Sequence, residues 1–233
     1  MIFNLLQTAV DTTALAAATP VAQEKTFSLI DMAIKGGWLM LVLLLLSIIA
    51  IYIFGNKWWM IRKAGNINKN FMNDIHDLIH EGKIKSAIAL CQRYDSPVAR
   101  LVEKGIERIG RPLQDIQTAV ENMGNVEVAR LEKGLPMLAT IAGGAPMIGF
   151  LGTVTGMIRA FFEMANAGNN IDITLLSGGI YEAMVTTVGG LFVGIIAYFG
   201  YNFLTSQISN LVFKMENATI AFIDMLHEPA EEN

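Results

Sequence analysis

Long apolar stretches dominate the sequence, and three of them, at residues 37–56, 134–162 and 179–205, are long enough to cross a lipid bilayer. A helix needs about 20 predominantly apolar residues to span the hydrocarbon core. The second and third stretches exceed this length, so we expect both helices to project beyond the membrane. The pattern therefore predicts an all-α membrane protein with three transmembrane helices, two of which extend into a helical domain.

The residues between the first two spans, 57–133, place apolar side chains at helical spacing and predict that domain. Ser96-Pro97 interrupts the pattern, and proline is favoured at the first position of a new helix. From Leu113 a further periodic pattern runs toward the second span, and it predicts a helix that continues into the membrane. The third span likewise continues through residues 206–233 as a helix that ends in an acidic tail.

The N-terminal residues 1–36 are expected to form a tail that contains a short amphipathic helix at 27–34. This helix places apolar side chains at the interface ahead of Trp38, a residue type that marks membrane boundaries. A cleaved signal peptide is the alternative, because the small residues of 14–19 resemble a cleavage site. The basic segment that normally precedes such a site is missing here, so we favour an uncleaved tail.

Basic residues are concentrated in 57–133, which holds 13 of the 17 lysines and arginines. The link between the second and third spans, 163–178, holds none. Because basic loops stay on the cytoplasmic side, this asymmetry places the helical domain and the C-terminus in the cytoplasm and the N-terminus on the opposite side. Arg159, near the outer end of the second span, departs from the rule. We expect it either to extend outward or to pair with Glu163.

The composition agrees with a membrane protein, since 53% of the 233 residues are hydrophobic and only 16% are charged. A pI near 5.4 gives no reason to expect binding to nucleic acid. Cys91 is the only cysteine, and His76 and His80, although four residues apart, are better explained as a solvated helix face than as metal ligands. We therefore predict no metal and no cofactor. No nucleotide-binding loop or hydrolase motif is present, so we predict that the chain is not an enzyme.

Glycines and threonines gather on one face of each of the last two spans, at three- and four-residue spacing. These residues are Gly149, Thr153 and Gly156 on the second span, and Thr187, Gly190 and Gly194 on the third. Small residues at this spacing let two membrane helices approach closely. Two interpretations of the threonines are open. Their hydroxyl groups bond to carbonyls of their own helices, as packing alone would require, or they hydrate a polar path through the membrane.

Ionisable groups are nearly absent from these spans. Glu182, at the start of the third span, is a functional candidate, although a position at the outer surface beside the helix N-terminus explains it equally well. No aspartate or histidine lies between Lys133 and Arg159, or between Ala183 and Phe213. A path for protons needs a group that titrates within the membrane. We therefore expect a second polypeptide to supply that group.

Two motifs resemble one known family. Residues 145–158 read Ala-Pro-Met-Ile-Gly-Phe-Leu-Gly-Thr-Val-Thr-Gly-Met-Ile, and residues 179–191 read Gly-Ile-Tyr-Glu-Ala-Met-Val-Thr-Thr-Val-Gly-Gly-Leu. They are similar to the second- and third-span motifs of the ExbB/TolQ/MotA family of proton-channel subunits, and most closely to those of ExbB. The run Lys-Gly-Gly-Trp at 35–38 is also ExbB-like. One departure is Ile196, where the family often has a proline.

The resemblance implies a homo-oligomer, a pentamer of this chain that surrounds a dimer of an ExbD-like single-span partner. A membrane aspartate of that partner would carry the proton. The positions that match the family's proton path are Thr153, Thr187 and Glu182, with Thr186, Asn202 and Arg159 as secondary candidates. Lipid is expected around the first span, which is apolar on all sides.

The resemblance also implies an inner-membrane motor that uses the proton gradient to energise TonB-dependent transport across an outer membrane, together with a TonB-like partner. The N-terminus would then be periplasmic. A TolQ-like subunit and a motility stator are close alternatives that the shared motifs do not separate. Two alternatives of other kinds are a structural membrane scaffold and an ion channel that needs no partner.

Overall fold

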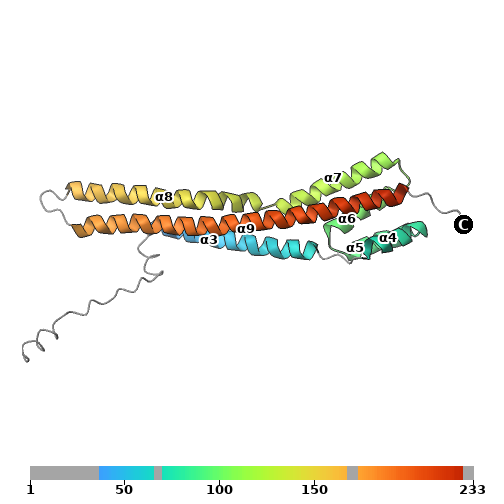
Figure 1. Ribbon diagram of the computed structural model, residues 1–233, viewed down its shortest axis with the longest axis horizontal. Coiled ribbons are helices and arrows are strands. Elements are labelled where there is room, and N and C mark those ends of the chain that lie inside the picture. The colour runs from blue at the N-terminus through green and yellow to red at the C-terminus, as the bar shows by residue number, and fades with distance from the viewer. Residues whose placement is uncertain (1–36, 66–69, 167–172, 228–233) are drawn as a thin grey trace, which may run out of the picture.

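The structure, a computed structural model, describes residues 37–65, 70–166 and 173–227. Within these ranges every regular element is a helix, and the molecule is long and narrow (Figure 1). The helix α9 (Ile173–His227) runs along almost the whole molecule, and the other helices pack along it. The expected amphipathic helix at 27–34 and the acidic C-terminal end lie outside the described residues.

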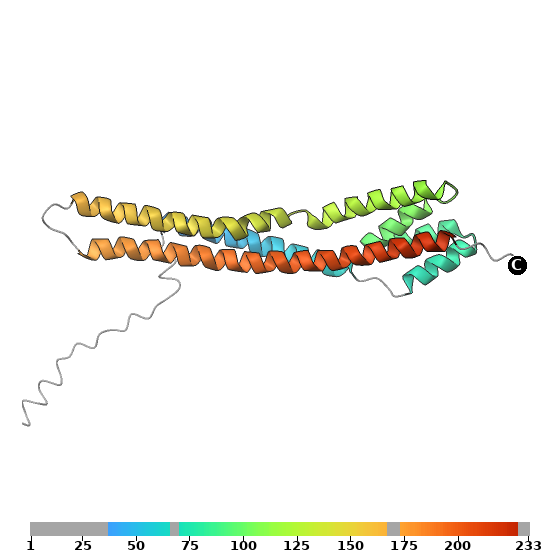
Figure 2. The same ribbon diagram turned by 45° about the horizontal axis from the view of Figure 1, so that its top comes forward.

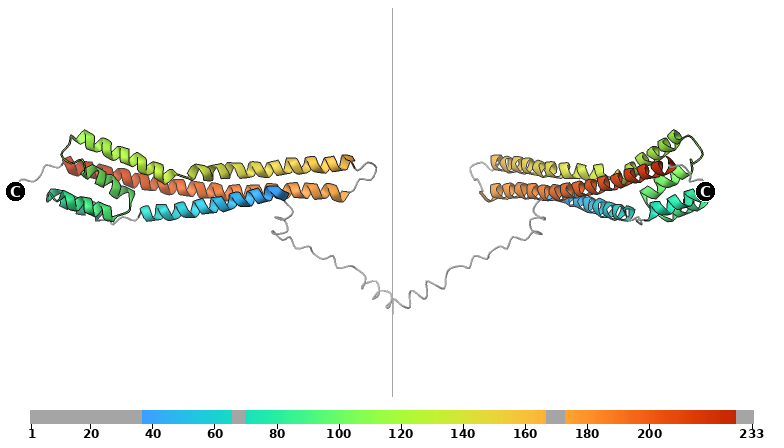
Figure 3. Two further views of the ribbon diagram at one scale, coloured as in Figure 1. Left: turned by 180° about the vertical axis from the view of Figure 1, so that it is seen from behind. Right: turned by 45° about the vertical axis from the view of Figure 1, so that its right-hand side comes forward.

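Three helices are long and apolar enough to cross a membrane, which confirms the prediction of an all-α membrane protein. They are α3 (Gly37–Ala64), α8 (Leu135–Asn166) and α9. Both α3 and α8 pack against α9, and α8 runs antiparallel to it (Figure 1 and Figure 3). As predicted, α9 then continues beyond the apolar part as one uninterrupted helix.

The helix α3 buries one narrow face and exposes the rest of its surface. Leu43 and Ala50 are buried, whereas Leu41, Leu44 and Ile48 are exposed. A helix that is apolar on all sides is suited to a lipid environment, because in water its exposed leucines would form a large apolar patch. The exposed apolar surface of α3 is of the kind that lipid would cover.

Four shorter helices form a domain at the far end of α9: α4 (Phe71–His80), α5 (Ile84–Arg93), α6 (Pro97–Ile106) and α7 (Leu113–Glu132) (Figure 2). Helix α6 begins where the sequence predicts, with Pro97 as its first residue. Ser96 caps this helix, because its Oγ accepts a hydrogen bond of 3.2 Å from the Ala99 N–H. Such a cap stabilises a helix by about 1 kcal/mol.

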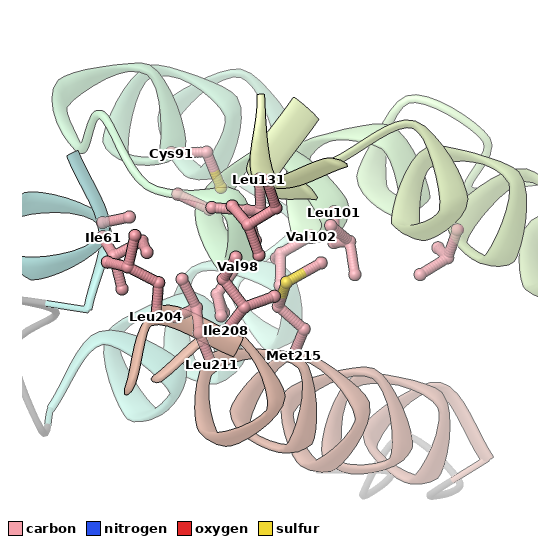
Figure 4. Close-up of a cluster of buried hydrophobic side chains, with 14 of the residues drawn as sticks. Ile61, Cys91, Val98, Leu101, Val102, Leu131, Leu204, Ile208, Leu211 and Met215 are labelled. Carbon is pink, nitrogen blue, oxygen red and sulfur yellow. The ribbon is translucent and has the colours of Figure 1, made fainter. Parts of the chain in front are cut away.

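One continuous apolar core joins this domain to the membrane helices (Figure 4). Its members come from every described helix, α3 to α9, and they include Ile61, Cys91, Val98, Leu101, Val102, Leu131, Leu204, Ile208, Leu211 and Met215. The contact of α6 with α9 is especially close, since any side chain at Gly105 would overlap the ring of Phe222. The domain is therefore packed directly onto α9 rather than tethered to it.

An ion pair connects α6 to α7 inside the domain. The Arg100 guanidinium donates to both carboxylate oxygens of Glu127, at 2.8 and 2.7 Å, and the Glu127 side chain is only 3% exposed. These hydrogen bonds raise the pKa of Arg100 above its ordinary value. Asp95 accepts hydrogen bonds from Lys63 and Arg100, at 2.9 Å each, and both cations lower the pKa of this carboxyl group. The exposed Lys63–Asp95 pair thus extends the same network to the end of α3.

The second span begins differently from the pattern in the sequence, which predicts one helix from Leu113 into the membrane. The structure has two helices here, because α7 ends at Glu132 and α8 begins at Leu135. Gly134, between them, has a φ of +94°, a backbone conformation that is common for glycine after a helix and costly for other residues. The break separates the helical domain from the membrane part of the chain.

The buried side chain of Lys57 in α3 caps the C-terminal end of α7 at this break. Its Nζ donates to the carbonyl oxygens of Arg130 and Leu131, at 3.2 Å each. The last carbonyls of a helix have no partner within the helix, and a cation is favoured beside them. Lys57 therefore connects the first span to the junction of α7 and α8.

Cys91, the single cysteine, lies in the apolar core and provides a test of that core. Burial, with a smaller contribution from Glu103, raises the pKa of the Cys91 thiol from its ordinary value of 9.0 to about 12. Only the thiolate reacts with alkylating reagents, so we expect iodoacetamide at pH 8 to modify Cys91 at least 100-fold more slowly in the folded protein than in urea. Mass spectrometry of the intact chain measures both rates.

The raised pKa of Cys91 also predicts how the stability of the protein changes with pH. Below pH 9 the thiol is protonated in both states, and between pH 9 and 12 only the unfolded state loses the proton. The free energy of unfolding should therefore fall over this window, and the fall should be smaller in Cys91→Ala. Rapid modification of the folded protein at pH 8 would show that Cys91 is not enclosed in this core.

Candidate functional site

The antiparallel helices α8 and α9 approach each other at Gly149 and Gly190, in the middle of the membrane part. A Cβ atom added to Gly190 would lie 2.6 Å from the Ala145 carbonyl oxygen and 2.8 Å from Gly149 Cα. A Cβ atom added to Gly149 would lie 3.0 Å from the carbonyl oxygen of Thr186. The two backbones are thus in contact, and no larger side chain fits at either position.

The close contact extends toward both ends of the pair. A Cβ atom on Gly156 would lie 2.9 Å from that of Ala183, and one on Gly194 would lie 2.5 Å from Cγ of Pro146. Pro146 lies inside α8, where it supplies no N–H to the helix. Its ring occupies the space that a side chain at position 194 would need. The four glycines predicted to pack helices therefore all face the partner helix.

The four threonines of the second- and third-span motifs, Thr153, Thr155, Thr186 and Thr187, donate their hydroxyl protons to backbone carbonyls. Thr187 bonds across the interface, with its Oγ1 donating to the Gly149 carbonyl oxygen at 2.9 Å. Thr186 is buried and donates to Ala183 within its own helix at 2.8 Å. Thr153 is half-buried and donates to Phe150 in the same way at 2.6 Å. The packing interpretation thus describes Thr153 and Thr186, whereas Thr187 connects the two helices.

A hydroxyl group that donates its proton still has lone pairs that can accept a hydrogen bond. In this arrangement Thr153 and Thr187 can accept a hydrogen bond from the O–H of a neutral carboxylic acid. To donate to a carboxylate, either hydroxyl must rotate away from its carbonyl. For Thr187 this rotation would break the hydrogen bond to Gly149 that joins α8 to α9. The two protonation states of an approaching carboxyl group would therefore encounter different hydrogen-bonding partners.

A polar groove of about 360 Å³ lies where the start of α3 meets the ends of α8 and α9 that are remote from the helical domain. Its lining includes Thr155, Arg159, Glu163, Glu182 and Thr186. Arg159 Nε lies 3.1 Å from Glu163 Oε1, so the second of the two expectations for this arginine is the one observed. The groove thus combines two carboxylates and one guanidinium with two hydroxyl groups.

Glu182 is half-buried in this groove, and its carboxylate contacts Gly37 at the start of α3. Gly37 has a φ of +66°, so both its conformation and the nearby carboxylate disfavour any other residue there. Glu182 therefore lies half-buried where α3, α8 and α9 meet. No periodicity in the sequence indicates this contact, because it joins residues that are far apart in the chain.

The structure brings only part of the predicted set together. Thr186, Glu182 and Arg159 share the outer groove, whereas Asn202 is exposed and donates to the carbonyl oxygen of Tyr198 at 2.9 Å. Fifteen residues of helix separate Asn202 from Thr187, roughly 22 Å along the axis. Asn202 therefore does not belong to either polar cluster within the described part of one chain.

Two residues of the outer groove are missing from the predicted set. Thr155, in the second-span motif, donates to the carbonyl oxygen of Leu151 at 2.9 Å, and Glu163 is predicted only as a partner for Arg159. Thr155 lies three residues after Gly152, and Glu163 lies four residues after Arg159. This helical spacing is the signal in the sequence that could have placed them on one helix face. Gly152 itself contacts Thr186 so closely that a Cβ atom would overlap the threonine side chain.

These features define a class of protein, an integral membrane protein whose two long helices form a close, hydroxyl-bearing pair with an ionisable groove at one end. The comparison with known proteins identifies the family. A sequence profile of the MotA/TolQ/ExbB proton channel family matches residues 93–217, more than half of the chain. The chain belongs to this family, as its motifs predict.

Three relatives show how far the likeness extends. A biopolymer transport protein of Synechocystis named ExbB-like 1 is 30% identical over 192 residues, which cover 82% of this chain and 76% of the relative. The Tol-Pal system protein TolQ of Haemophilus influenzae is 35% identical over 106 residues, 46% of each chain. The biopolymer transport protein ExbB of Xanthomonas campestris is 36% identical over 90 residues, 39% of this chain and 35% of the relative.

The contact at Gly190 predicts a clear difference between two glycine substitutions. Gly190→Ala forces a Cβ atom against the backbone of α8, so we expect it to reduce the free energy of unfolding by about 1–3 kcal/mol. Gly55→Ala is the matched control in α3, since nothing lies within 4 Å of a Cβ atom there. Removal of glycine from a helix should leave that variant equal to the wild type or more stable by up to about 1 kcal/mol.

Thermal unfolding in detergent, followed by circular dichroism, compares the two variants. Equal melting temperatures for Gly190→Ala and Gly55→Ala would contradict the contact between backbones. A loss confined to Gly190→Ala would support it.

Proposed function

We propose that this chain is the ExbB-like subunit of a proton-driven motor in a bacterial inner membrane, and that it energises TonB-dependent transport across the outer membrane. The family and the relatives named ExbB support this proposal. The N-terminus would lie in the periplasm and the helical domain in the cytoplasm, because that domain holds most of the basic residues.

One observation carries the proposal: the close pair of α8 and α9 presents hydroxyl groups at membrane depth but no carboxyl or imidazole group of its own there. Thr187 and Thr153 supply hydrogen bonds, and no aspartate or histidine lies between Ala183 and Phe213. A proton that crosses at this depth therefore needs a carboxyl group from another chain. An ExbD-like single-span protein with an aspartate in its membrane helix would supply it.

The proposed cycle uses the two orientations of the threonine hydroxyl groups. A protonated aspartic acid of the partner donates to Thr153 or Thr187 while these hydroxyls keep their bonds to backbone carbonyls. After the acid gives its proton to water on the side of the helical domain, the carboxylate needs donors, and the Thr187 hydroxyl turns toward it and releases Gly149. The partner's helix would thus be bound differently before and after each proton transfer, as a motor requires.

Energy for this cycle comes from the membrane potential. One charge that crosses 100 mV releases about 2.3 kcal/mol, which exceeds the net value of about 1 kcal/mol for one hydrogen bond. Each proton can therefore drive an exchange of hydrogen bonds such as the one at Thr187. The groove with Glu182 and Arg159 lies on the opposite side from the helical domain, so we assign to it the entry of protons from the periplasm.

The proposed assembly is a homopentamer around a dimer of the partner. Large apolar side chains such as Met147, Phe150 and Phe192 are exposed on α8 and α9 in the isolated chain. Those that do not face lipid are available for contacts with further copies and with the partner's helix. A TonB-like protein would receive the motion, and the surrounding lipid would contact α3.

A TolQ-like role is the second candidate, and the similarity to TolQ of Haemophilus influenzae is the observation that favours it. Complementation separates the two roles. A strain that lacks its own ExbB should regain TonB-dependent uptake when it carries this chain and its partner. Restoration of envelope integrity in a strain that lacks TolQ, without any gain in uptake, would favour the TolQ-like role instead.

The polar path itself is tested by replacing both threonines. Valine keeps the shape of threonine but cannot form a hydrogen bond, so we expect Thr153→Val together with Thr187→Val to reduce TonB-dependent uptake at least tenfold. Uptake of a labelled substrate in the complemented strain measures this effect. Co-purification with the partner should persist, because the glycine contacts of α8 and α9 remain.

The matched control combines Thr140→Val and Thr219→Val, one on each helix. These hydroxyls also donate to backbone carbonyls, of Pro136 and Met215, at 2.8 and 3.0 Å. The control should transport normally. Normal uptake by the Thr153 and Thr187 double variant would overturn the polar path and favour a structural scaffold.

A further inference from the structure

Two grooves follow each other along the line where α3 packs on α9, which we call the α3–α9 seam. The first has a volume of about 350 Å³, and its lining includes Ile51, Phe54, Phe199 and Phe203. The second has a volume of about 600 Å³, and its lining extends from Phe203 to Lys214. Because Phe203 lines both, the grooves are neighbours and together follow a long stretch of the seam.

The two grooves differ sharply in chemistry. Ser47 is the only polar side chain that lines the first groove, and the other residues there are apolar. The second groove contains two cations, Arg62 and Lys214, and two amide side chains, Gln207 and Asn210. No carboxylate lines this groove. An apolar groove beside a basic one is complementary to a molecule with an apolar chain and an anionic head.

The cations of the second groove are available to a ligand. Neither Arg62 nor Lys214 has a carboxylate within 4.0 Å among the described residues, and both side chains are exposed. Arg62 instead lies over the indole of Trp58, with its guanidinium carbon 5.7 Å from the ring centroid. A second basic groove, which Arg62 also lines, is less suited to an anion because Asp95 lines it.

The position along α3 matches the boundary of a bilayer. The exposed apolar side chains of α3 end with Trp58 and Trp59, and the basic residues Arg62 and Lys63 follow within the next turn. Tryptophan followed by lysine and arginine is typical of the level of lipid head groups. The apolar groove therefore lies at the depth of acyl chains and the basic groove at the depth of phosphates.

We propose that the α3–α9 seam binds one anionic phospholipid from the leaflet on the side of the helical domain. Its phosphate lies between Arg62 and Lys214, where the guanidinium offers paired donors and the ammonium adds a point charge. Gln207 and Asn210 donate to the head group or the ester oxygens. One acyl chain follows the groove between Phe54 and Phe199. The site depends on the membrane fold and not on the proposed motor function.

Native mass spectrometry of the full chain in detergent tests this site by titration with phosphatidylglycerol and phosphatidylcholine. We expect tighter binding of phosphatidylglycerol, and about a thirtyfold loss of that binding in Arg62→Gln with Lys214→Gln, the factor expected for two basic residues near an anionic surface. Binding of phosphatidylcholine should stay unchanged. Lys214→Gln alone should lose about fivefold, and this variant keeps the test valid if the double variant does not fold.

The matched control, Lys85→Gln with Arg111→Gln, removes the same charge from exposed positions in the helical domain and should bind phosphatidylglycerol as the wild type does. An unchanged affinity for phosphatidylglycerol in Arg62→Gln with Lys214→Gln would overturn the proposal. So would displacement of the lipid by inorganic phosphate at millimolar concentration, which would indicate a phosphate site. A change in oligomeric state without a change in lipid binding would show that a second copy covers the seam.

Discussion

The contact of backbones between α8 and α9 is the constraint on which the membrane part of this protein depends. Gly149 and Gly190 allow that contact, and only at this separation can the Thr187 hydroxyl reach a carbonyl of the other helix. Within a bilayer no water satisfies polar groups, so such groups persist only where the protein itself supplies partners. The glycines therefore position the hydroxyl groups on which the proposed proton path relies.

The same pair of helices connects the membrane to the helical domain. Helix α9 passes through both parts without interruption, and Phe222 near its far end fits against Gly105 of α6. Helix α8 is instead separated from α7 at Gly134, where Lys57 of the first span closes the end of α7. One connection to the domain is thus a continuous helix, and the other is a junction secured by a single buried lysine.

Much of this arrangement could be predicted from the sequence, because hydropathy and spacing depend on neighbouring residues. The three spans and the glycine faces are of this kind. The prediction of one helix across Gly134 rested on apolar spacing alone, whereas Gly134 and Pro136, the second residue of α8, are residue types typical of a helix end and of a helix start. The position of Glu182 beside Gly37 could not be predicted in this way, because it depends on a contact between distant residues. The directions of the Thr153 and Thr187 hydroxyls depend on side-chain geometry, which no pattern of residue types contains.

The central claim is that this chain supplies half of a proton path and that a partner supplies the titrating carboxyl group. Proton flux into liposomes under an imposed membrane potential measures this most directly. The purified chain alone should conduct no more than empty liposomes, and flux should begin when a single-span partner with an intact membrane aspartate is present. Sustained proton flux through this chain alone would contradict the account.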